Sequence, residues 1–308
     1  MLKVGIIRGG VGKLGEQSIE TGGAIISHLY SDSLNTLYKP IDILVDSGGA
    51  WHMNGLPTDM ERIRHSVDIV LNTLHGEYGE DGRLSQELSQ WGIPHTSSSP
   101  LSQAITYNRA FAKEEFAKLG IQTPKHMLFE AYLEDMDGPE IDYPIRKAKE
   151  VFNKMGPPWV VKPLTRGSSM GIHVCKTLPE LMRAFAVGMG ERVSLIVEEI
   201  VEGKHACVSV TDDYRGQKLY PFICIGNFSQ DEKREVERLA TLVHQGLGLE
   251  HYSLSHFVVH PRKGIYAIEV ETIPDLRVGS TLASHLEAAG SSQQDFINHL
   301  IGRAVRQK

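Results

Sequence analysis

Three short apolar segments within the first 75 residues constrain the fold of this chain more than any other feature. Each has the length of a buried strand, and together they are KVGIIR (residues 3–8), IDILVDS (41–47) and VDIVLNTLH (67–75). Helical segments are expected from Glu16 to about Leu29 and from Asp81 to about Trp91. Strands that alternate with helices predict an α/β unit with a parallel sheet and crossover helices.

Two further units are expected after a Thr- and Ser-rich boundary near residues 95–100. The middle unit should contain a helix at 108–119, a strand within 120–129, and strands on both sides of the loop that follows WVVKP (159–163). The last unit should open with SLIVEEIVEG (194–203) and add strands, a helix, a hairpin and a C-terminal helix. We therefore predict three parts, which are residues 1–96, 97–190 and 191–308.

Composition excludes several classes of protein. Among 308 residues, 41% are hydrophobic and 23% charged, which is typical of a globular chain. Lys and Arg total 32 against 38 Asp and Glu, and no basic run is present, so we expect no nucleic-acid partner. No apolar run reaches the length of a membrane span, and the start of the chain lacks a signal-peptide pattern. Cys175, Cys207 and Cys224 form no C-x-x-C pair, so we expect buried thiols in a reducing cytoplasm.

A loop of small residues follows the apolar strand at 159–163. Lys162 ends the strand with a positive charge, and the loop carries Gly167, Ser168, Ser169 and Gly171. Glycines let backbone N–H groups approach a ligand closely, and the serines add hydroxyl donors, so the stretch is suited to phosphate oxygens. The pattern is not a Walker A loop, and from this stretch alone an ordinary hairpin loop with a solvated lysine stays open.

Three other segments carry polar groups at the ends or faces of expected strands. TLHGEYGEDGRLSQEL (73–88) places His75 beside flexible backbone and a helix N-terminus, which favours carboxylate or phosphate groups, although Asp81 also fits a helix cap. In AIEVET (267–272), alternation puts Glu269 and Glu271 on one strand face, where a magnesium ion would relieve their repulsion. The alternative is an exposed sheet face. LIVEEIVEG can present backbone groups to an adenine edge.

Taken in order, these four segments resemble the D-alanine–D-alanine ligases of the ATP-grasp superfamily over almost the whole chain. The motif L-H-G-x-x-G-E-D-G stands at 74–82, and V-K-P-x-x-x-G-S-S-x-G stands at 161–171. The resemblance implies an α/β protein of the ATP-grasp fold, with an N-terminal Rossmann-like parallel-sheet domain and two α+β ATP-grasp subdomains. It also implies that ATP, with Mg²⁺ or Mn²⁺, phosphorylates one D-alanine carboxylate, which the amine of a second D-alanine attacks. The dipeptide serves peptidoglycan precursors.

The resemblance also implies roles for individual residues. Catalytic roles fall on Glu16, His75 and Ser168, and substrate binding on His75, Ser280, Asp275 and Arg277. ATP contacts fall on Arg109, Lys162, Gly167, Ser168, Ser169, Glu198, Glu199, Val201, His205 and Glu269. Metal ligands fall on Glu269, Glu271 and His256. The partners are small amino acids, D-alanine by resemblance, and a homodimer stays open.

Several positions depart from the family pattern. Leu14 stands where the family has the glutamate that orients the substrate amine, and Leu254 where it has an arginine that supports the developing oxyanion. Four further departures are Arg109 for a lysine, His205 for the ribose-binding acid, His256 for a metal carboxylate and Asp275 for a glycine. After KLYPFICIG the family carries a long lid loop, whereas Asn227 and Phe228 here lead almost directly into a helix. A lid excludes water from reactive intermediates.

Two other functions stay open. The departures also fit a nucleotide-binding protein with another amino-acid substrate or little ligase activity. The pattern Gly10-x-Gly12-x-x-Gly15 after a strand satisfies a dinucleotide fingerprint, but Asp46 lies too far along the chain and Asp32 too early for the ribose-binding acid. The sequence has no H-E-x-x-H motif, which argues against a zinc site.

Overall fold

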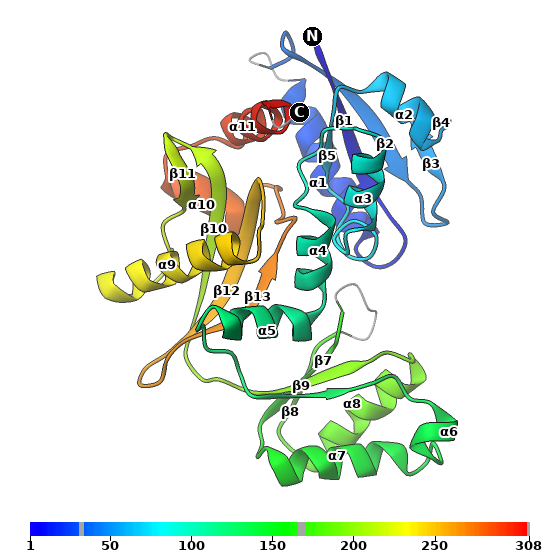
Figure 1. Ribbon diagram of the computed structural model, residues 1–308, viewed down its shortest axis with the longest axis vertical. Helices are drawn as coiled ribbons and strands as arrows, with labels where there is room; N and C mark the ends of the chain where they lie inside the picture. Colours follow the sequence, from blue (N-terminus) through cyan, green and yellow to red (C-terminus); the bar gives the residue numbers. More distant parts are fainter. Residues whose placement is uncertain (31–33, 166–170, 307–308) are drawn as a thin grey trace. The chain divides into compact units, whose positions relative to one another are not determined.

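The computed structural model describes residues 1–30, 34–165 and 171–306 (Figure 1). The chain divides into two compact units. Unit 1 is made of residues 1–107, 205–257 and 269–308, and unit 2 of residues 108–204 and 258–268. The division into three parts at 96 and 190 stays a prediction. Among the described residues, no helix has the length and apolar character needed to cross a bilayer.

Unit 1 contains the expected parallel strands in a five-stranded sheet. Its order is β4-β3-β2-β1-β5, with β1 at Leu2–Gly9, β2 at Tyr38–Val45, β3 at Trp51–Met53, β4 at Leu56–Pro57 and β5 at Ile69–Asn72. Strand β1 pairs in parallel with both β2 and β5, which confirms the predicted parallel core. Strands β3 and β4 add an antiparallel edge that the sequence analysis did not predict.

The side chains of β1 alternate between the two faces of this sheet, and helices cover both faces. Val4 and Ile6 pack in one core cluster with α1 (Gly15–Leu29) and α11 (Gln293–Arg306). Ile7 packs in another cluster with α2 (Met60–Ser66) and α3 (Arg83–Gln90). Each fully buried aliphatic side chain contributes about 1.5–3 kcal/mol relative to exposure. The segment KVGIIR, whose apolar residues 4–7 are all buried, is therefore a central strand with two buried faces.

A second sheet has the order β11-β10-β12-β13. Its strands are β10 (Lys204–Tyr214), β11 (Gln217–Pro221), β12 (Tyr252–His260) and β13 (Gly264–Glu271), and the helices nearby in sequence are α9 (Gln230–Gly246) and α10 (Thr281–Ala288). Only residues 222–229 connect β11 to α9, and Ser229 already caps that helix in a reciprocal hydrogen-bonded box with Glu232. The short connection expected in place of a lid loop is confirmed.

Unit 2 contains a four-stranded sheet with the order β6-β9-β7-β8. The strands are β6 (His126–Phe129), β9 (Leu195–Glu199), β7 (Trp159–Pro163) and β8 (His173–Cys175). Helices α7 (Tyr143–Lys154) and α8 (Leu178–Gly190) lie side by side below it in Figure 1, and their apolar residues pack with Trp159. The remaining helices are α4 (Pro100–Tyr107) in unit 1, and α5 (Arg109–Lys118) and α6 (Glu134–Asp137) in unit 2.

Two features of unit 2 depend on contacts between distant segments. Strand β9, within segment 194–203, pairs with β6 and β7, where Leu195 and Val197 complete the core around Trp159. The charged, Pro-containing stretch before Trp159, to which the sequence analysis assigned no element, contains α7. Its proline lies in the first turn, where a helix tolerates the missing N–H, and its charges lie on the solvent side.

A buried carboxylate joins four elements of unit 1. Asp212 on β10 is only 6% exposed, and its oxygens lie 3.2 Å from His244 Nε2 on α9 and 2.7 Å from Arg303 Nη2 on α11. The backbone N–H of His251, in the loop before β12, donates to the same carboxylate at 2.7 Å. Burial opposes the charged form, but these partners outweigh it and hold the pKa of Asp212 below its usual value.

We predict that Asp212→Asn lowers the free energy of unfolding by about 3–5 kcal/mol, because it removes the buried carboxylate that Arg303, His244 and the His251 N–H share. The neighbouring Asp213→Asn is the matched control, since Asp213 is more than half exposed and pairs with the same arginine at 3.3 Å. That variant should cost less than about 1 kcal/mol. Urea denaturation followed by circular dichroism measures both values, and equal effects would contradict the assignment of Asp212 as the structural carboxylate.

Candidate functional site

The carboxyl ends of β1 and β5 form the first part of the site. Within the sheet, β2 lies next to β1 on one side and β5 lies next to β1 on the other. Ligands of open α/β sheets bind at the carboxyl ends of two strands whose connections diverge in this way. Gly10 follows β1, and residues 73–75 follow β5. Ser18 on α1 accepts from the His75 N–H and donates to the Thr73 carbonyl oxygen, both at 2.8 Å. This contact fixes the backbone that carries His75.

His75, Asp275 and Arg277 lie in one cluster. Thr21 Oγ1 lies 3.3 Å from His75 Nε2 and 3.2 Å from Asp275 Oδ1. Arg277 bonds Asp275 at 2.8–3.1 Å and also pairs with Glu20. Burial lowers the pKa of His75, and the carboxylates of Asp275 and Glu271 oppose this only in part, so the ring is neutral at pH 7. Burial raises the pKa of Asp275, but its bonds to Arg277 bring it below the usual value.

His256, Glu269 and Glu271 form a candidate metal cluster in unit 1. One ligand atom from each lies within 4.8 Å of the others, and His256 Nε2 is 2.9 Å from Glu271 Oε1. Strand alternation brings both glutamates to the same face of β13, as predicted. Glu271 also acts electrostatically on His75, so the metal cluster and the His75 cluster share one region of unit 1.

Glu198 lies between two lysines in unit 2. Its oxygens are 3.0 Å from Lys162 Nζ and 3.1 Å from Lys113 Nζ, and the side chains of all three are at most 9% exposed. Burial opposes the carboxylate, yet the ammonium groups outweigh it and keep the pKa of Glu198 below its usual value. The formal charges of these three groups sum to +1, because two ammonium groups share one carboxylate. Such a cluster is suited to an anionic ligand.

Known proteins resemble this chain in sequence and in fold. The family described as D-ala D-ala ligase C-terminus matches residues 116–221. A D-alanine–D-alanine ligase of Geobacter sulfurreducens is 27% identical over 320 residues, which cover 97% of this chain and 93% of that relative. A second D-alanine–D-alanine ligase, from Fervidobacterium nodosum, is 26% identical over 98% of this chain and 99% of its own length.

Solved structures show the same fold. D-alanyl-alanine synthetase A from Vibrio cholerae superposes with a TM-score of 0.86 at 20% identity, over 100% of this chain and 99% of its own. VanG D-Ala:D-Ser ligase from Enterococcus faecalis gives 0.82 at 21% identity, over 98% and 99%. The D-alanine–D-alanine ligase from Bacillus anthracis complexed with ATP gives 0.79 at 23%, over 99% and 98%.

In sequence, the chain is similar to D-alanine–D-alanine ligases over almost its whole length. Its fold is the ATP-grasp fold of these ligases, as the resemblance implied.

The other candidate residues lie at the following positions in the structure. Glu16 is exposed in the first turn of α1. Ser280 caps α10 by accepting from the Ala283 N–H. Arg109 donates to the carbonyl oxygens of Pro163 and Thr165, and Glu199 accepts from the Lys125 N–H. Glu199 and Val201 also line a cavity of about 150 Å³.

The remaining positions singled out in the sequence are His205, Leu254 and three residues of the loop after β7. His205 is exposed on β10. Leu254 is buried at 4% exposure, so the arginine of the family has no cationic substitute at that position. Gly167, Ser168 and Ser169 lie outside the described residues. Their expected phosphate contacts, and the catalytic role expected for Ser168, stay predictions.

Sequence reasoning missed Lys113 and Cys207. Lys113 lies on the buried face of α5 with Ala110 and Phe116, and a lysine at that helical spacing indicates a buried partner. Cys175 and Cys224 are buried, as expected for all three thiols. Cys207 is only partly buried, and its Sγ lies 3.2 Å from His256 Nδ1. No signal in the sequence indicated this contact, because the two residues meet only through strand pairing.

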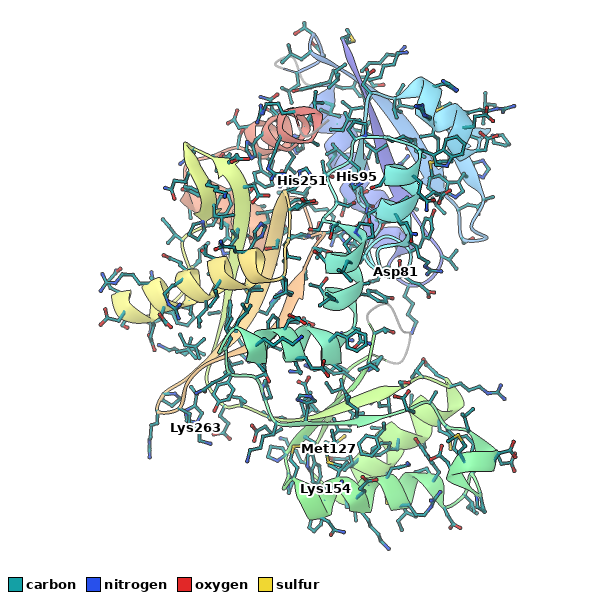
Figure 2. All side chains as sticks on the ribbon, viewed as in Figure 1. Asp81, His95, Met127, Lys154, His251 and Lys263 are labelled. Atoms are coloured by element: carbon teal, nitrogen blue, oxygen red, sulfur yellow. The ribbon has the colours of Figure 1, made fainter. Side chains whose placement is uncertain are left out.

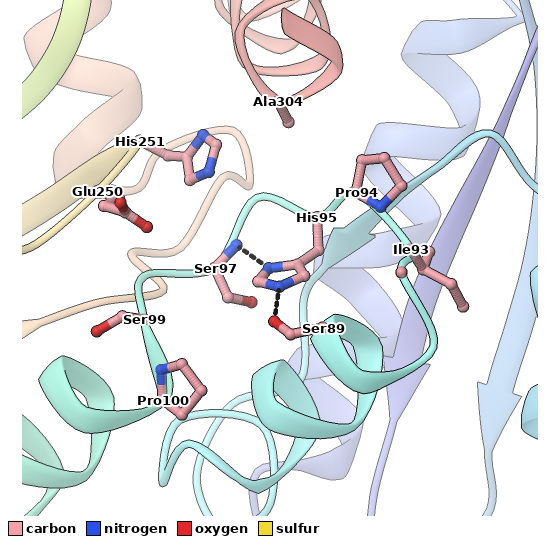
Figure 3. Close-up of a pocket in the computed structure, with 11 residues that line it drawn as sticks. Ser89, Ile93, Pro94, His95, Ser97, Ser99, Pro100, Glu250, His251 and Ala304 are labelled. Carbon is pink, nitrogen blue, oxygen red and sulfur yellow. Dashed lines mark hydrogen bonds between the residues drawn. The ribbon is translucent and has the colours of Figure 1, made fainter. Parts of the chain in front are cut away.

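A cavity of about 510 Å³ lies apart from these clusters in unit 1. His95, Glu250 and His251 line it, and Figure 2 labels both histidines. Arg303 Nη1 donates to His251 Nδ1 at 3.2 Å, so the neutral ring carries its proton on Nε2. In Figure 3, His95 accepts from the Ser97 N–H and bonds Ser89. Burial, with Arg303 nearby, lowers the pKa of His251 to about 3.

This shift predicts a pH-dependent stability. Between about pH 6.5 and 3 the unfolded chain binds a proton at His251 and the folded chain does not. The free energy of unfolding therefore decreases by about 1.4 kcal/mol for each unit by which the pH is lowered. His251→Asn should reduce this slope, since asparagine tolerates the positive φ of 64° that His251 adopts. Urea denaturation between pH 7 and pH 4.5 measures the slope. The control His65→Asn, at an exposed position on α2, should retain the wild-type profile.

Removing the shared carboxylate of unit 2 should destabilise the protein. Glu198→Gln leaves two buried ammonium groups without their anion, and we expect a loss of about 3–5 kcal/mol. Glu199→Gln is the matched control, because glutamine can still accept from the Lys125 N–H, and it should cost less than about 1 kcal/mol. Urea denaturation compares the two. Equal stability of both variants would show that Glu198 does not compensate the lysines.

Proposed function

We propose that this chain is an ATP-dependent carboxylate–amine ligase that forms a D-amino-acid dipeptide through an acyl phosphate, with D-alanine as the first substrate to test. One observation carries the proposal. A cation site of one histidine and two glutamates lies in the same region of unit 1 as the cluster of His75, Asp275 and Arg277. Acyl-phosphate chemistry needs both parts, because an amino acid must be held where metal-bound phosphate can reach its carboxylate.

The amino-acid side of the site uses charge complementarity. Asp275 is ionised, so its carboxylate can accept an α-ammonium group, a role that Leu14 cannot fill. Arg277 supplies a guanidinium for an α-carboxylate, and Ser280 at the start of α10 adds a hydroxyl and a helix N-terminus. Neutral His75 can donate or accept a hydrogen bond beside them.

The nucleotide side of the site relies on buried cations. Lys162 and Lys113 share Glu198, and this arrangement is suited to phosphate oxygens. The solved complex of the Bacillus anthracis relative with ATP supports ATP as the nucleotide. His256, Glu269 and Glu271 fit a divalent ion by their donor atoms. When bound, such an ion neutralises charge on the phosphates.

The short connection between β11 and α9 predicts imperfect coupling. Without a lid loop, water can reach the acyl phosphate before the second amine does. We expect D-alanine to stimulate ADP release, with more ADP than dipeptide formed. A coupled ADP assay and chromatography of the dipeptide measure the two products. An ADP to dipeptide ratio of one would show that water is excluded by other means.

The substrate assay tests the ligase directly. Wild-type protein with ATP and Mg²⁺ or Mn²⁺ should release ADP with D-alanine or D-serine and not with the L-amino acids. Asp275→Asn should raise the KM for the amino acid at least tenfold, because the ammonium group loses its anionic partner. Asp59→Asn, at the start of α2, is the control and should match the wild type. Absence of ADP release with every D- and L-amino acid would contradict the ligase proposal.

A nucleotide-binding protein with little ligase activity is the second candidate, and the buried Leu254 favours it. Calorimetry distinguishes the two, because tight ATP binding without turnover would support it. An NAD-dependent dehydrogenase is disfavoured. The oxygens of Asp46, the acid that follows β2, already accept from the N–H groups of Gly48 and Ala50 and contact His52. A cytoplasmic location and a homodimer stay predictions.

A further inference from the structure

The metal cluster contains a nitrogen donor. His256 stands where the family resemblance implies a carboxylate. Its Nε2 atom points at the cluster and lies 2.9 Å from Glu271 Oε1. Two donors on neighbouring corners of an octahedral site, each about 2.1 Å from the ion, lie about 3 Å apart. The imidazole is therefore already placed as one ligand of the site, beside the two carboxylates.

Cys207 contacts Nδ1, the second ring nitrogen of this imidazole. It lies on β10, next to β12 in the sheet, and its Sγ is 3.2 Å from His256 Nδ1. With a proton on Nδ1 the ring donates to sulfur, and Nε2, which contacts Glu271 Oε1 at 2.9 Å, is then the atom that coordinates an ion when the ion replaces the Nε2 proton. Partners of this kind fix the tautomer and orientation of a ligating histidine and raise its basicity.

The donor set has consequences for the choice of ion. Mg²⁺ prefers oxygen ligands and rigid octahedral geometry, whereas imidazole nitrogen suits first-row transition ions. We propose that His256 shifts the preference of this site from Mg²⁺ toward first-row divalent ions, for which Mn²⁺ is the probe, and that Cys207 is the positioning residue for His256. The inference rests on the proposed function for the catalytic use of the ion, while the binding of the ion is measurable without substrate.

Competition binding tests the selectivity. Electron paramagnetic resonance reports free Mn²⁺ during titration of the protein, and Mg²⁺ is then added as competitor. The ratio of the Mg²⁺ to the Mn²⁺ dissociation constant should be roughly tenfold or more higher in the wild type than in His256→Asp, which restores a carboxylate. His256→Asn is the second variant if the first does not fold. Control His260→Asp, at the end of the same strand, should keep the wild-type ratio.

Cobalt spectroscopy tests the role of Cys207. Cys207→Ala should weaken Mn²⁺ binding by about 10–100-fold, as expected when a ligating histidine loses its partner, and Cys207→Ser, which keeps an acceptor for Nδ1–H, should restore most of the affinity. Wild-type protein with Co²⁺ should show ligand-field bands without a strong sulfur-to-cobalt charge-transfer band. A strong charge-transfer band would overturn the positioning role, since sulfur would then be a ligand.

The failures of the two proposals are distinguishable. An unchanged Mg²⁺ to Mn²⁺ ratio in His256→Asp and His256→Asn would overturn the inference, whatever the outcome of the ligase assay. A selective site in a protein that releases no ADP with any amino acid would leave the inference standing and contradict the proposed ligase.

Discussion

Glu198 lies buried between the ammonium groups of Lys113 and Lys162, and this ionic contact joins α5, β7 and β9 of unit 2. A buried charge is stable only beside compensating charge or hydrogen bonds, so none of the three residues can change alone without cost. Because two cations share one anion, the three groups carry a net positive charge. The same contact therefore stabilises the fold of unit 2 and leaves a charge that is suited to an anionic ligand.

In unit 1, opposite charges surround the neutral imidazole of His75. Parallel β1 and β5 end at one edge of their sheet, and the glycine-rich turn and His75 follow them there. Asp275, Arg277 and Glu20 then place both signs of charge around a neutral imidazole, which is the complement of a zwitterion. The nearby Glu271 belongs to the candidate metal cluster and acts electrostatically on His75, so the two clusters lie in one region of unit 1.

Much of the fold follows from local patterns. The parallel strands, α1, α9 and the pairing of Glu269 with Glu271 on one strand face could be predicted, since each depends on periodicity along one segment. The position of β9, the helix α7, and the partners Lys113 and Cys207 could not, because each depends on contacts between distant segments. Lys162 illustrates the difference, since its position at a strand end was evident and its buried pairing with Glu198 was not.

We propose that ATP binding depends on Lys162 of unit 2 and on the metal cluster of unit 1, and each contribution is measurable by itself. Calorimetric titration with ATP, in the presence of Mn²⁺ and again with a chelator, tests it in wild-type protein, Lys162→Met and Glu271→Gln. The account predicts that Lys162→Met weakens ATP binding under both conditions, and that Glu271→Gln removes the dependence on the ion. ATP affinity that is unchanged by both substitutions would contradict the account.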